Sequence, residues 1–131
     1  MSTLSLHVRT PSSLVLEIDV RALRAEDHDG WFGVAPGRTE LVAVLPPGLL
    51  IYRDADDHEA YVALSRGLLH VQGAHCWVMA REALASSDLR AVEAELERYS
   101  SARRERHSRE RTLIDELARE ALRRMAEELR R

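Results

Sequence analysis

All six glycines and all four prolines of this chain lie within the first 73 residues, and residues 74–131 contain neither. Glycine and proline mark chains with many tight turns, whereas long helices exclude both from their interiors. The first part of the chain therefore favours short strands separated by turns, and the last part favours helix. A length of 131 residues fits one domain, or one domain with an appendage.

Strand periodicity is clear in the first part. Leu4, Leu6 and Val8 alternate with polar residues, and the run 14–20 does the same. Seven or eight short strands, with a turn about every ten residues, are typical of an antiparallel β-sandwich or flattened barrel. We expect this domain to cover residues 1–83, with the remaining strands at residues 40–45, 49–52, 59–65, 68–72 and 76–80.

Helical periodicity begins beyond residue 83. Leu89, Val92, Leu96 and Tyr99 form one helical stripe, which the good N-cap residues 86–88 precede. A second stripe lies between residues 113 and 129. The polar stretch 100–111 favours a joint between two antiparallel helices, although one long helix also satisfies it. The expected fold class is thus α+β, a sandwich followed by a helical hairpin over residues 84–131. Because each stripe is narrow, the hairpin should be marginally stable and able to detach from its support.

A constrained loop runs from Ala25 to Leu45. Asp29-Gly30 and Pro36-Gly37 are turn dipeptides, and a short apolar piece, Trp31 to Val34, lies between them. The chain should therefore turn, run briefly as a strand and turn again. Trp31 is either the tip of a contact surface or part of a tight corner folded onto the sheet.

Catalysis and metal binding are not expected. The six histidines show no i, i+4 pair, and the acidic clusters 26–29 and 54–59 fall in turns without metal-binding spacing. No nucleophile or phosphate-binding motif is present. The single cysteine, Cys76, lies in an apolar run and is expected to be a buried, inert thiol. We therefore expect no enzyme activity, no metal site and no cofactor.

The helical part carries a run of arginines, and this run supports an alternative function. A solvated helical face is the simplest interpretation, because the net charge of −3 argues against general nucleic-acid affinity. A regulatory module that docks on acidic protein or RNA is the functional alternative, although RNA binding lacks interleaved aromatics. The run consists of Arg103, Arg104, Arg106, Arg109 and Arg111.

Three segments resemble the epsilon subunit of rotary F-type ATP synthases. Residues 29–38 resemble the family's Asp-Gly-x-Phe-Gly-x-x-Pro-Gly-His segment, residues 63–71 its Ala-Val-Ser-Gly-Gly-x-x-x-Val segment, and Leu6–Pro11 the approach. The similarity follows the whole chain in order and is strongest over residues 4–80. It implies a non-catalytic central-stalk subunit whose sandwich sits beside the gamma subunit. It also implies that loops of the sandwich touch the membrane c-ring.

The resemblance also assigns residues and partners. The implied rotor-contact loop consists of Asp29, Gly30, Trp31, Phe32, Gly33, Pro36, Gly37 and Arg38. Trp31 stands where the family commonly has an acidic residue and Arg38 where it has histidine, which suggests a different c-ring surface. The helical part would act as a regulatory arm that carries the arginine run, reaches the alpha and beta subunits and inhibits ATP hydrolysis.

A nucleotide motif of the family is incomplete in this chain. Arg90 and Ala91 match the end of the motif Ile/Leu-Asp-x-x-Arg-Ala, but its first two positions fall on Ser86 and Ser87. Losing that carboxylate predicts weak or no ATP binding. No apolar run reaches the roughly 18 residues of a membrane helix. The expected location is the cytoplasmic face of the cell membrane, with membrane contact only through partners and no contact with nucleic acid.

Overall fold

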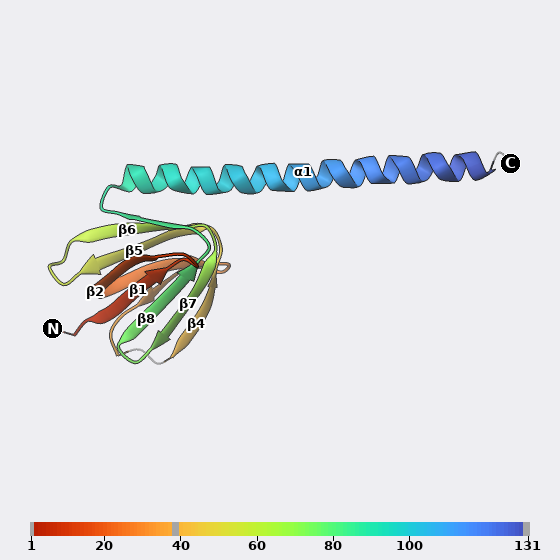
Figure 1. Ribbon diagram of the computed structural model, residues 1–131. Helices are drawn as coiled ribbons and strands as arrows, with labels where there is room; N and C mark the ends of the chain where they lie inside the picture. The colour runs from red at the N-terminus through yellow and green to blue at the C-terminus, as the bar shows by residue number, and fades with distance from the viewer. Residues whose placement is uncertain (1, 38–39, 130–131) are drawn as a thin grey trace. The chain divides into compact units, whose positions relative to one another are not determined.

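The structure is a computed structural model that describes residues 2–37 and 40–129, without the side chains of residues 103, 107 and 129. The chain divides into two compact units, Met1–Tyr99 and Ser100–Arg131. Nine strands are followed by one helix, α1 (Leu89–Leu129) (Figure 1). The strands are β1 (Leu4–Arg9), β2 (Leu14–Asp27), β3 (Gly30–Val34), β4 (Leu41–Leu45), β5 (Gly48–Asp54), β6 (Glu59–Leu64), β7 (Gly67–Gln72), β8 (His75–Ala80) and β9 (Ala83–Ser86).

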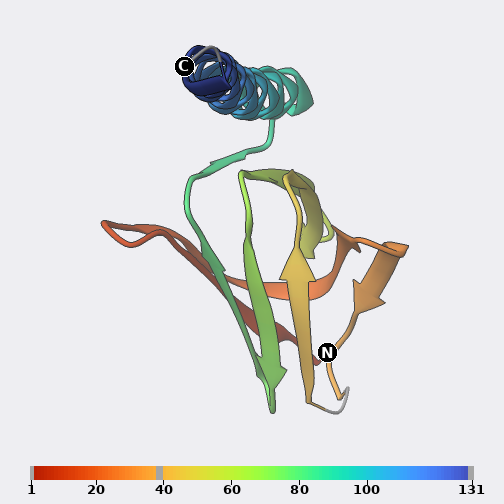
Figure 2. The same ribbon diagram turned by 90° about the vertical axis from the view of Figure 1, so that its right-hand side faces the viewer.

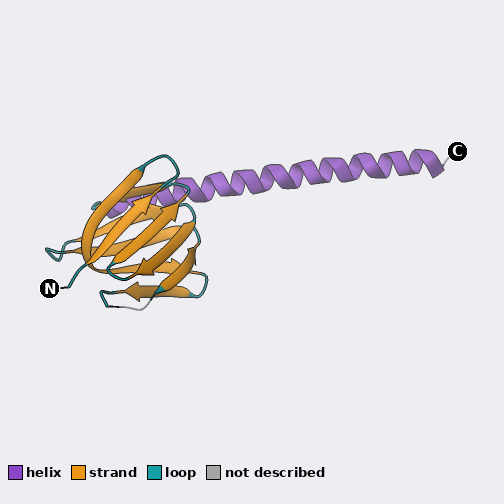
Figure 3. Ribbon diagram, turned by 60° about the horizontal axis from the view of Figure 1, so that its bottom comes forward, coloured by secondary structure: helices purple, strands orange, loops and turns teal. Residues whose placement is uncertain are grey.

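Strand β2 joins the two layers of the sandwich. Its first half pairs with β1 from Leu14 to Val20, and its second half pairs with β5 and β3. The register shifts between Val20 and Ala22, and such irregularities bend a strand and increase its twist. One layer therefore has the order β4-β7-β8-β1-β2, and the other continues through β2, β5, β6 and β9 with β3 on the far side of β2. Figure 3 shows these strands as one body.

The core fills the space between the layers with alternate residues of each strand. In β1 the buried side chains are Leu4, Leu6 and Val8, and none of the three is accessible to solvent. Val71, Cys76 and other buried residues of β7 and β8 complete the same cluster. Period-two alternation in the sequence therefore becomes the inward and outward alternation of a half-buried sheet.

The predicted β-sandwich is confirmed, and so are the strands predicted from periodicity. Strand β9 was not predicted, because residues 84–86 lie in the part of the chain expected to be helical. This strand pairs antiparallel with β6, from Tyr61↔Ser86 to Leu64↔Ala83. A four-residue strand carries too few alternating positions for period-two patterning to stand out.

The helical part requires a correction. Instead of two antiparallel helices, the structure has the single helix α1 over the whole of Leu89–Leu129, as the sequence also allowed. The physical reason is that residues 100–111 contain no helix breaker and consist mainly of arginine, glutamate, serine and alanine. Arginine, glutamate and alanine are good helix formers, and polarity alone does not end a helix. No helix in the described part of the chain is long and apolar enough to cross a membrane.

Asp88 caps the start of α1, as the sequence predicted for the segment 86–88. Its Oδ1 accepts a hydrogen bond from the Arg90 amide at 3.0 Å. The Asp88 amide in turn donates to Ser86 Oγ at 3.0 Å. An aspartate in this position satisfies an amide that has no partner within the helix, and its charge favours the positive end of the helix dipole.

The first turns of α1 belong to the same unit as the sandwich and pack on it. Val92 and Tyr99 are buried in a small cluster with Ala63 of β6, and Leu96 packs against this cluster. Arg98 donates to Glu82 Oε2 at 2.9 Å and also pairs with Glu95. Burial, followed by the nearby charges of Glu95 and Glu82, raises the pKa of Tyr99 to about 12. The predicted first stripe therefore packs against the sandwich.

Gly67 is the glycine whose replacement should damage the sandwich most. A Cβ at Gly67 would lie 2.3 Å from the Met79 carbonyl oxygen and 3.1 Å from Ala80 Cα. We expect Gly67→Ala to lower the free energy of unfolding by about 1–3 kcal/mol or more, since β7 and β8 must separate to admit the methyl group. Chemical denaturation of the full chain measures this loss.

Gly33→Ala is the matched control for that variant. The nearest atom to a Cβ at Gly33 is the Leu23 carbonyl oxygen at 3.9 Å, which is ordinary contact. Equal stability of the two variants would contradict the close approach of β7 and β8 at Gly67.

Candidate functional site

The first half of the predicted contact loop is a tight β-hairpin between β2 and β3. Asp27 pairs with Gly30, and the two-residue turn between them is closed by the Asp29 amide, which donates to Asp27 Oδ1 at 2.8 Å. Gly30 has a φ of +124°, a conformation that other residues rarely adopt. The turn dipeptide Asp29-Gly30 therefore has the structural role that its sequence predicts.

Trp31 and Phe32 point to opposite sides of β3. The Trp31 side chain is 51% exposed, whereas Phe32 is partly buried and packs against the sandwich core. Of the two interpretations left open by the sequence, this geometry favours an exposed tip. Large aromatic rings with one exposed face are common anchors in protein interfaces.

The second half of the loop contains the Pro36-Gly37 turn. Gly37 has a φ of +85°, which explains why glycine follows proline at this point. Pro36 is partly buried and Gly33 lies exposed in β3. Arg38, the last member of the predicted loop, lies outside the described residues.

A shallow hollow of about 380 Å³ connects the hairpin to β4. The hollow is lined by Asp27, His28, Asp29 and Phe32 of the hairpin and by residues 41–44 of β4. This hollow makes the β2–β3 turn continuous with the outer surface of β4. The structure therefore extends the candidate site beyond the residues that the sequence singled out.

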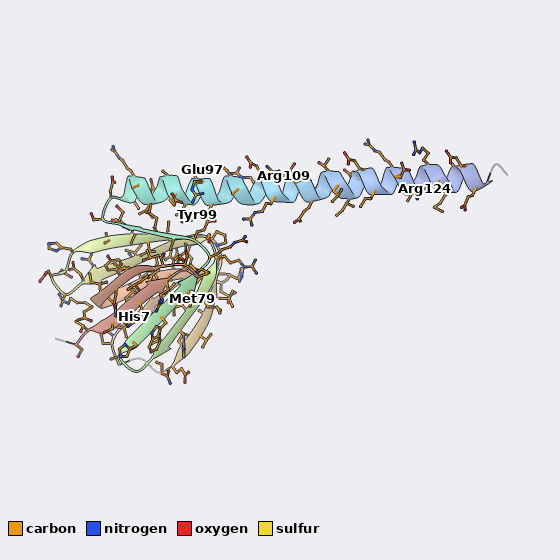
Figure 4. All side chains as sticks on the ribbon, in the orientation of Figure 1. His7, Met79, Glu97, Tyr99, Arg109 and Arg124 are labelled. Carbon is orange, nitrogen blue, oxygen red and sulfur yellow. The ribbon has the colours of Figure 1, made fainter. Side chains whose placement is uncertain are left out.

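An apolar surface that was not predicted from the sequence lies on the layer β4-β7-β8. Figure 2 shows these three strands side by side. Val42 pairs with His70, Val44 with Leu68, and Leu68 with Met79, so these side chains share one outward face. We call this surface the outer β4–β8 face. Its exposed apolar members are Val42, Val44, Leu68, Trp77 and Met79 (Met79 is labelled in Figure 4).

An exposed apolar patch of this kind marks an interaction surface in soluble proteins. Val42 is 64% exposed and Val44 is 55% exposed, although both lie within strand β4. The signal in the sequence was the unbroken apolar run Leu41–Leu45, which makes both faces of β4 apolar. Such a run is typical of a strand covered on both sides, and within the described residues nothing covers the outer side of β4.

The arginine run lies on α1 within the second unit. Arg109 Nη2 lies 4.0 Å from Glu105 Oε2, and Arg104 Nε donates to the Ser100 carbonyl at 3.5 Å (Arg109 is labelled in Figure 4). The apolar side chains Leu113, Ile114, Leu117, Leu122 and Met125 of this unit are 57–66% exposed. In the second predicted stripe, residues 113–129, these side chains therefore form an exposed apolar surface.

The incomplete nucleotide motif occupies the junction between β9 and α1. Ser86 ends β9, and Arg90 and Ala91 lie in the first turn of α1. Asp88 offers a carboxylate here, but its Oδ1 already accepts the Arg90 amide as the helix cap. The Asp88 carboxylate therefore lies one residue after the motif's aspartate position and serves as the cap of α1.

The acidic turns and Cys76 have structural roles. Ligand atoms of Asp54, Asp56 and His58 lie within 4.8 Å of one another, but Asp54 Oδ1 accepts the Asp56 and His58 amides, each at 2.9 Å. These hydrogen bonds show that the three residues are grouped because they form a turn.

Cys76 is fully buried, as predicted, and burial raises the pKa of its thiol to about 12. A thiol that is protonated and shielded from solvent is a poor nucleophile.

Comparison with known proteins identifies the family. The family model described as ATP synthase, Delta/Epsilon chain, beta-sandwich domain, matches residues 3–86. The chain belongs to this family. ATP synthase epsilon chain 2 of Paraburkholderia xenovorans (strain LB400) is 36% identical over 97 residues, which cover 72% of this chain and 70% of the relative. ATP synthase epsilon chain 2 of Cereibacter sphaeroides is 36% identical over 102 residues, which cover 76% of this chain and 70% of that relative.

Solved structures show the same fold at lower identity. A chain of the Euglena gracilis mitochondrial ATP synthase, in a structure of OSCP, F1 and c-ring, aligns with a TM-score of 0.61 and 22% identity. The alignment covers 65% of this chain and 54% of the Euglena chain. A chain of the Tetrahymena thermophila central stalk and c-ring aligns with a TM-score of 0.54 and 18% identity, covering 62% and 65%. Membership in the family makes this chain a non-catalytic ATP synthase subunit, part of a membrane-bound complex.

Trp31 and Phe32 allow a direct test of which loop residue is structural. We expect Trp31→Ala to change the free energy of unfolding by less than about 1 kcal/mol, because half of its side chain is exposed. Phe32→Ala should cost about 2–3 kcal/mol, because it removes a ring that packs on the core. Denaturant titrations of both variants measure the difference, and a larger loss for Trp31→Ala would contradict the orientation of β3.

Proposed function

We propose that this chain is a central-stalk subunit of a rotary ATP synthase that links the gamma subunit to the c-ring. The observation that carries the proposal is the match of residues 3–86 to the epsilon β-sandwich family together with an exposed, glycine-shaped hairpin at β2–β3. In this role the chain transmits torque and performs no chemistry. Residues 1–83 form the domain that contacts gamma and the ring.

The β2–β3 hairpin and the Pro36-Gly37 turn form the ring-facing loop in this proposal. Trp31 offers an exposed apolar anchor, and two glycines with positive φ hold the backbone turns that present it. The loops of a c-ring would meet this tip. Replacement of the family's usual acidic residue by Trp31 suits a ring whose loops offer an apolar contact.

The outer β4–β8 face is the surface that we assign to gamma. It has the apolar composition of an interface, with Leu68 and Met79 about half exposed. The hollow beside β4 makes it contiguous with the ring-facing loop. One small domain therefore offers adjoining surfaces to two partners.

The helical part, residues 84–131, is proposed as a regulatory arm. Its apolar stripe is exposed, and the arginine run adds positive charge for acidic partner surfaces. The alpha and beta subunits are the proposed targets, and contact with them would inhibit ATP hydrolysis. The chain would work at the cytoplasmic face of the cell membrane without binding nucleic acid. The displaced Asp88 carboxylate supports weak or absent ATP binding.

Ring docking is tested with two variants in the hairpin, Trp31→Glu and Gly33→Leu. Both positions are exposed, so the substitutions should leave the fold intact while they place charge or bulk in the contact. We expect weaker coupling of ATP hydrolysis to ion pumping in the assembled complex, measured as pumping per ATP hydrolysed. Normal coupling with both hairpin variants would remove the ring assignment.

Contact with gamma is tested on the outer β4–β8 face. Met79→Ala should weaken co-purification of the chain with gamma.

Inhibition by the arm is tested by removing residues 100–131. This truncation keeps Val92 and Tyr99, which cover Ala63, so the first unit retains its packing. We expect the ATPase activity of the assembled complex to rise severalfold. Unchanged activity would show that the arm has no inhibitory role. Salt-sensitive binding of the full chain to acidic protein or RNA without gamma would instead support the alternative of a free regulatory module.

A further inference from the structure

Three histidines surround Trp77 on the outer β4–β8 face, and two of them bring ring nitrogens together. His7 Nε2 lies 3.2 Å from His75 Nδ1. The two residues come from the parallel pair β1 and β8, in which His7 pairs with Trp77 and Ser5 with His75. Both therefore project from the same side of the sheet on neighbouring strands, 68 residues apart in the chain. We propose that His7 and His75 form a binding site for a divalent transition-metal ion such as Ni²⁺, Zn²⁺ or Cu²⁺.

The separation of the two nitrogens fits shared coordination. Metal–imidazole bonds of about 2.0–2.1 Å place two ligand nitrogens about 2.9 Å apart at a right angle and about 3.3 Å apart at a tetrahedral angle. The observed 3.2 Å lies within that interval. An ion can therefore take the place of the hydrogen bond without a change in the separation of the two nitrogens. Water would complete the coordination, since imidazole pairs of this type suit Zn, Cu and Ni.

Glu17 supplies the outer support that such a site needs. Its Oε1 lies 3.1 Å from His7 Nδ1, on the far side of the ring from His75. Donation from Nδ1 to this carboxylate leaves the Nε2 lone pair directed at the shared position. A carboxylate bonded to the second nitrogen of a metal-binding histidine fixes the ring and raises its basicity. The negative charge of Glu17 also favours a cation.

Ring stacking holds the pair in place before any ion arrives. The ring centroids of His7 and Trp77 are 5.8 Å apart and those of His75 and Trp77 are 5.2 Å apart, both with nearly parallel planes. The His7 side chain is only 17% exposed, so its orientation is restricted. Rigid placement of ligands reduces the entropy that binding must overcome.

Trp77 also provides the measurement, because a bound paramagnetic ion would quench its fluorescence. Trp31→Phe leaves Trp77 as the one tryptophan of the chain. In this background we expect Ni²⁺ to quench Trp77 emission saturably, and Zn²⁺ to compete and restore the emission. Absence of saturable quenching would overturn the proposal.

Three further substitutions in the Trp31→Phe background test which side chains bind the ion. His75→Gln should abolish saturable quenching, and Glu17→Gln should weaken Ni²⁺ binding roughly tenfold. His70→Gln is the matched control. The His70 ring also lies beside Trp77, with 6.0 Å between ring centroids, but its Nε2 is hydrogen-bonded to Glu40 Oε1 at 2.9 Å. An equal loss with His70→Gln and His75→Gln, or unaltered binding with His75→Gln, would overturn the assignment. Circular dichroism of each variant checks that it remains folded.

Discussion

The bend of β2 is the constraint on which the sandwich depends. Because this 14-residue strand pairs with β1 along its first half and with β5 and β3 along its second, the two layers are parts of one continuous hydrogen-bonded sheet. The register shift at Val20 and Ala22 changes the direction of the strand. The same strand then ends in the hairpin that carries Trp31. The core and the exposed tip are therefore positioned by one element, and a distortion at the bend would reach both.

Much of this arrangement follows from local patterns. Alternation in residues 4–9 predicts β1 with its exact bounds, and the dipeptides at Asp29-Gly30 and Pro36-Gly37 predict the two turns that the structure contains. The aspartate cap at residue 88 follows from the preference of helix N-termini for short polar side chains. These features depend on neighbours in the sequence, which is why a single chain reveals them.

Features that depend on distant partners could not be predicted in the same way. The outer β4–β8 face requires the register of three strands, and His7 meets His75 only because β1 and β8 are adjacent and parallel. The histidines show no metal-binding spacing in the sequence for that reason. The helical hairpin predicted over residues 84–131 is wrong for a different reason. The polar residues 100–111 favour a joint but all tolerate helix, and the structure has one continuous helix there. The exposure of Trp31 could not be predicted either, because it depends on how β3 pairs with β2 and packs on the core.

The apolar outer side of β4 also affects how the chain behaves outside its complex. Val42 and Val44 leave two branched side chains facing water within a strand at the edge of its layer. Exposed edges of this composition recruit other strands and promote aggregation. Copies of the chain without their assembly partners would therefore tend to self-associate through β4.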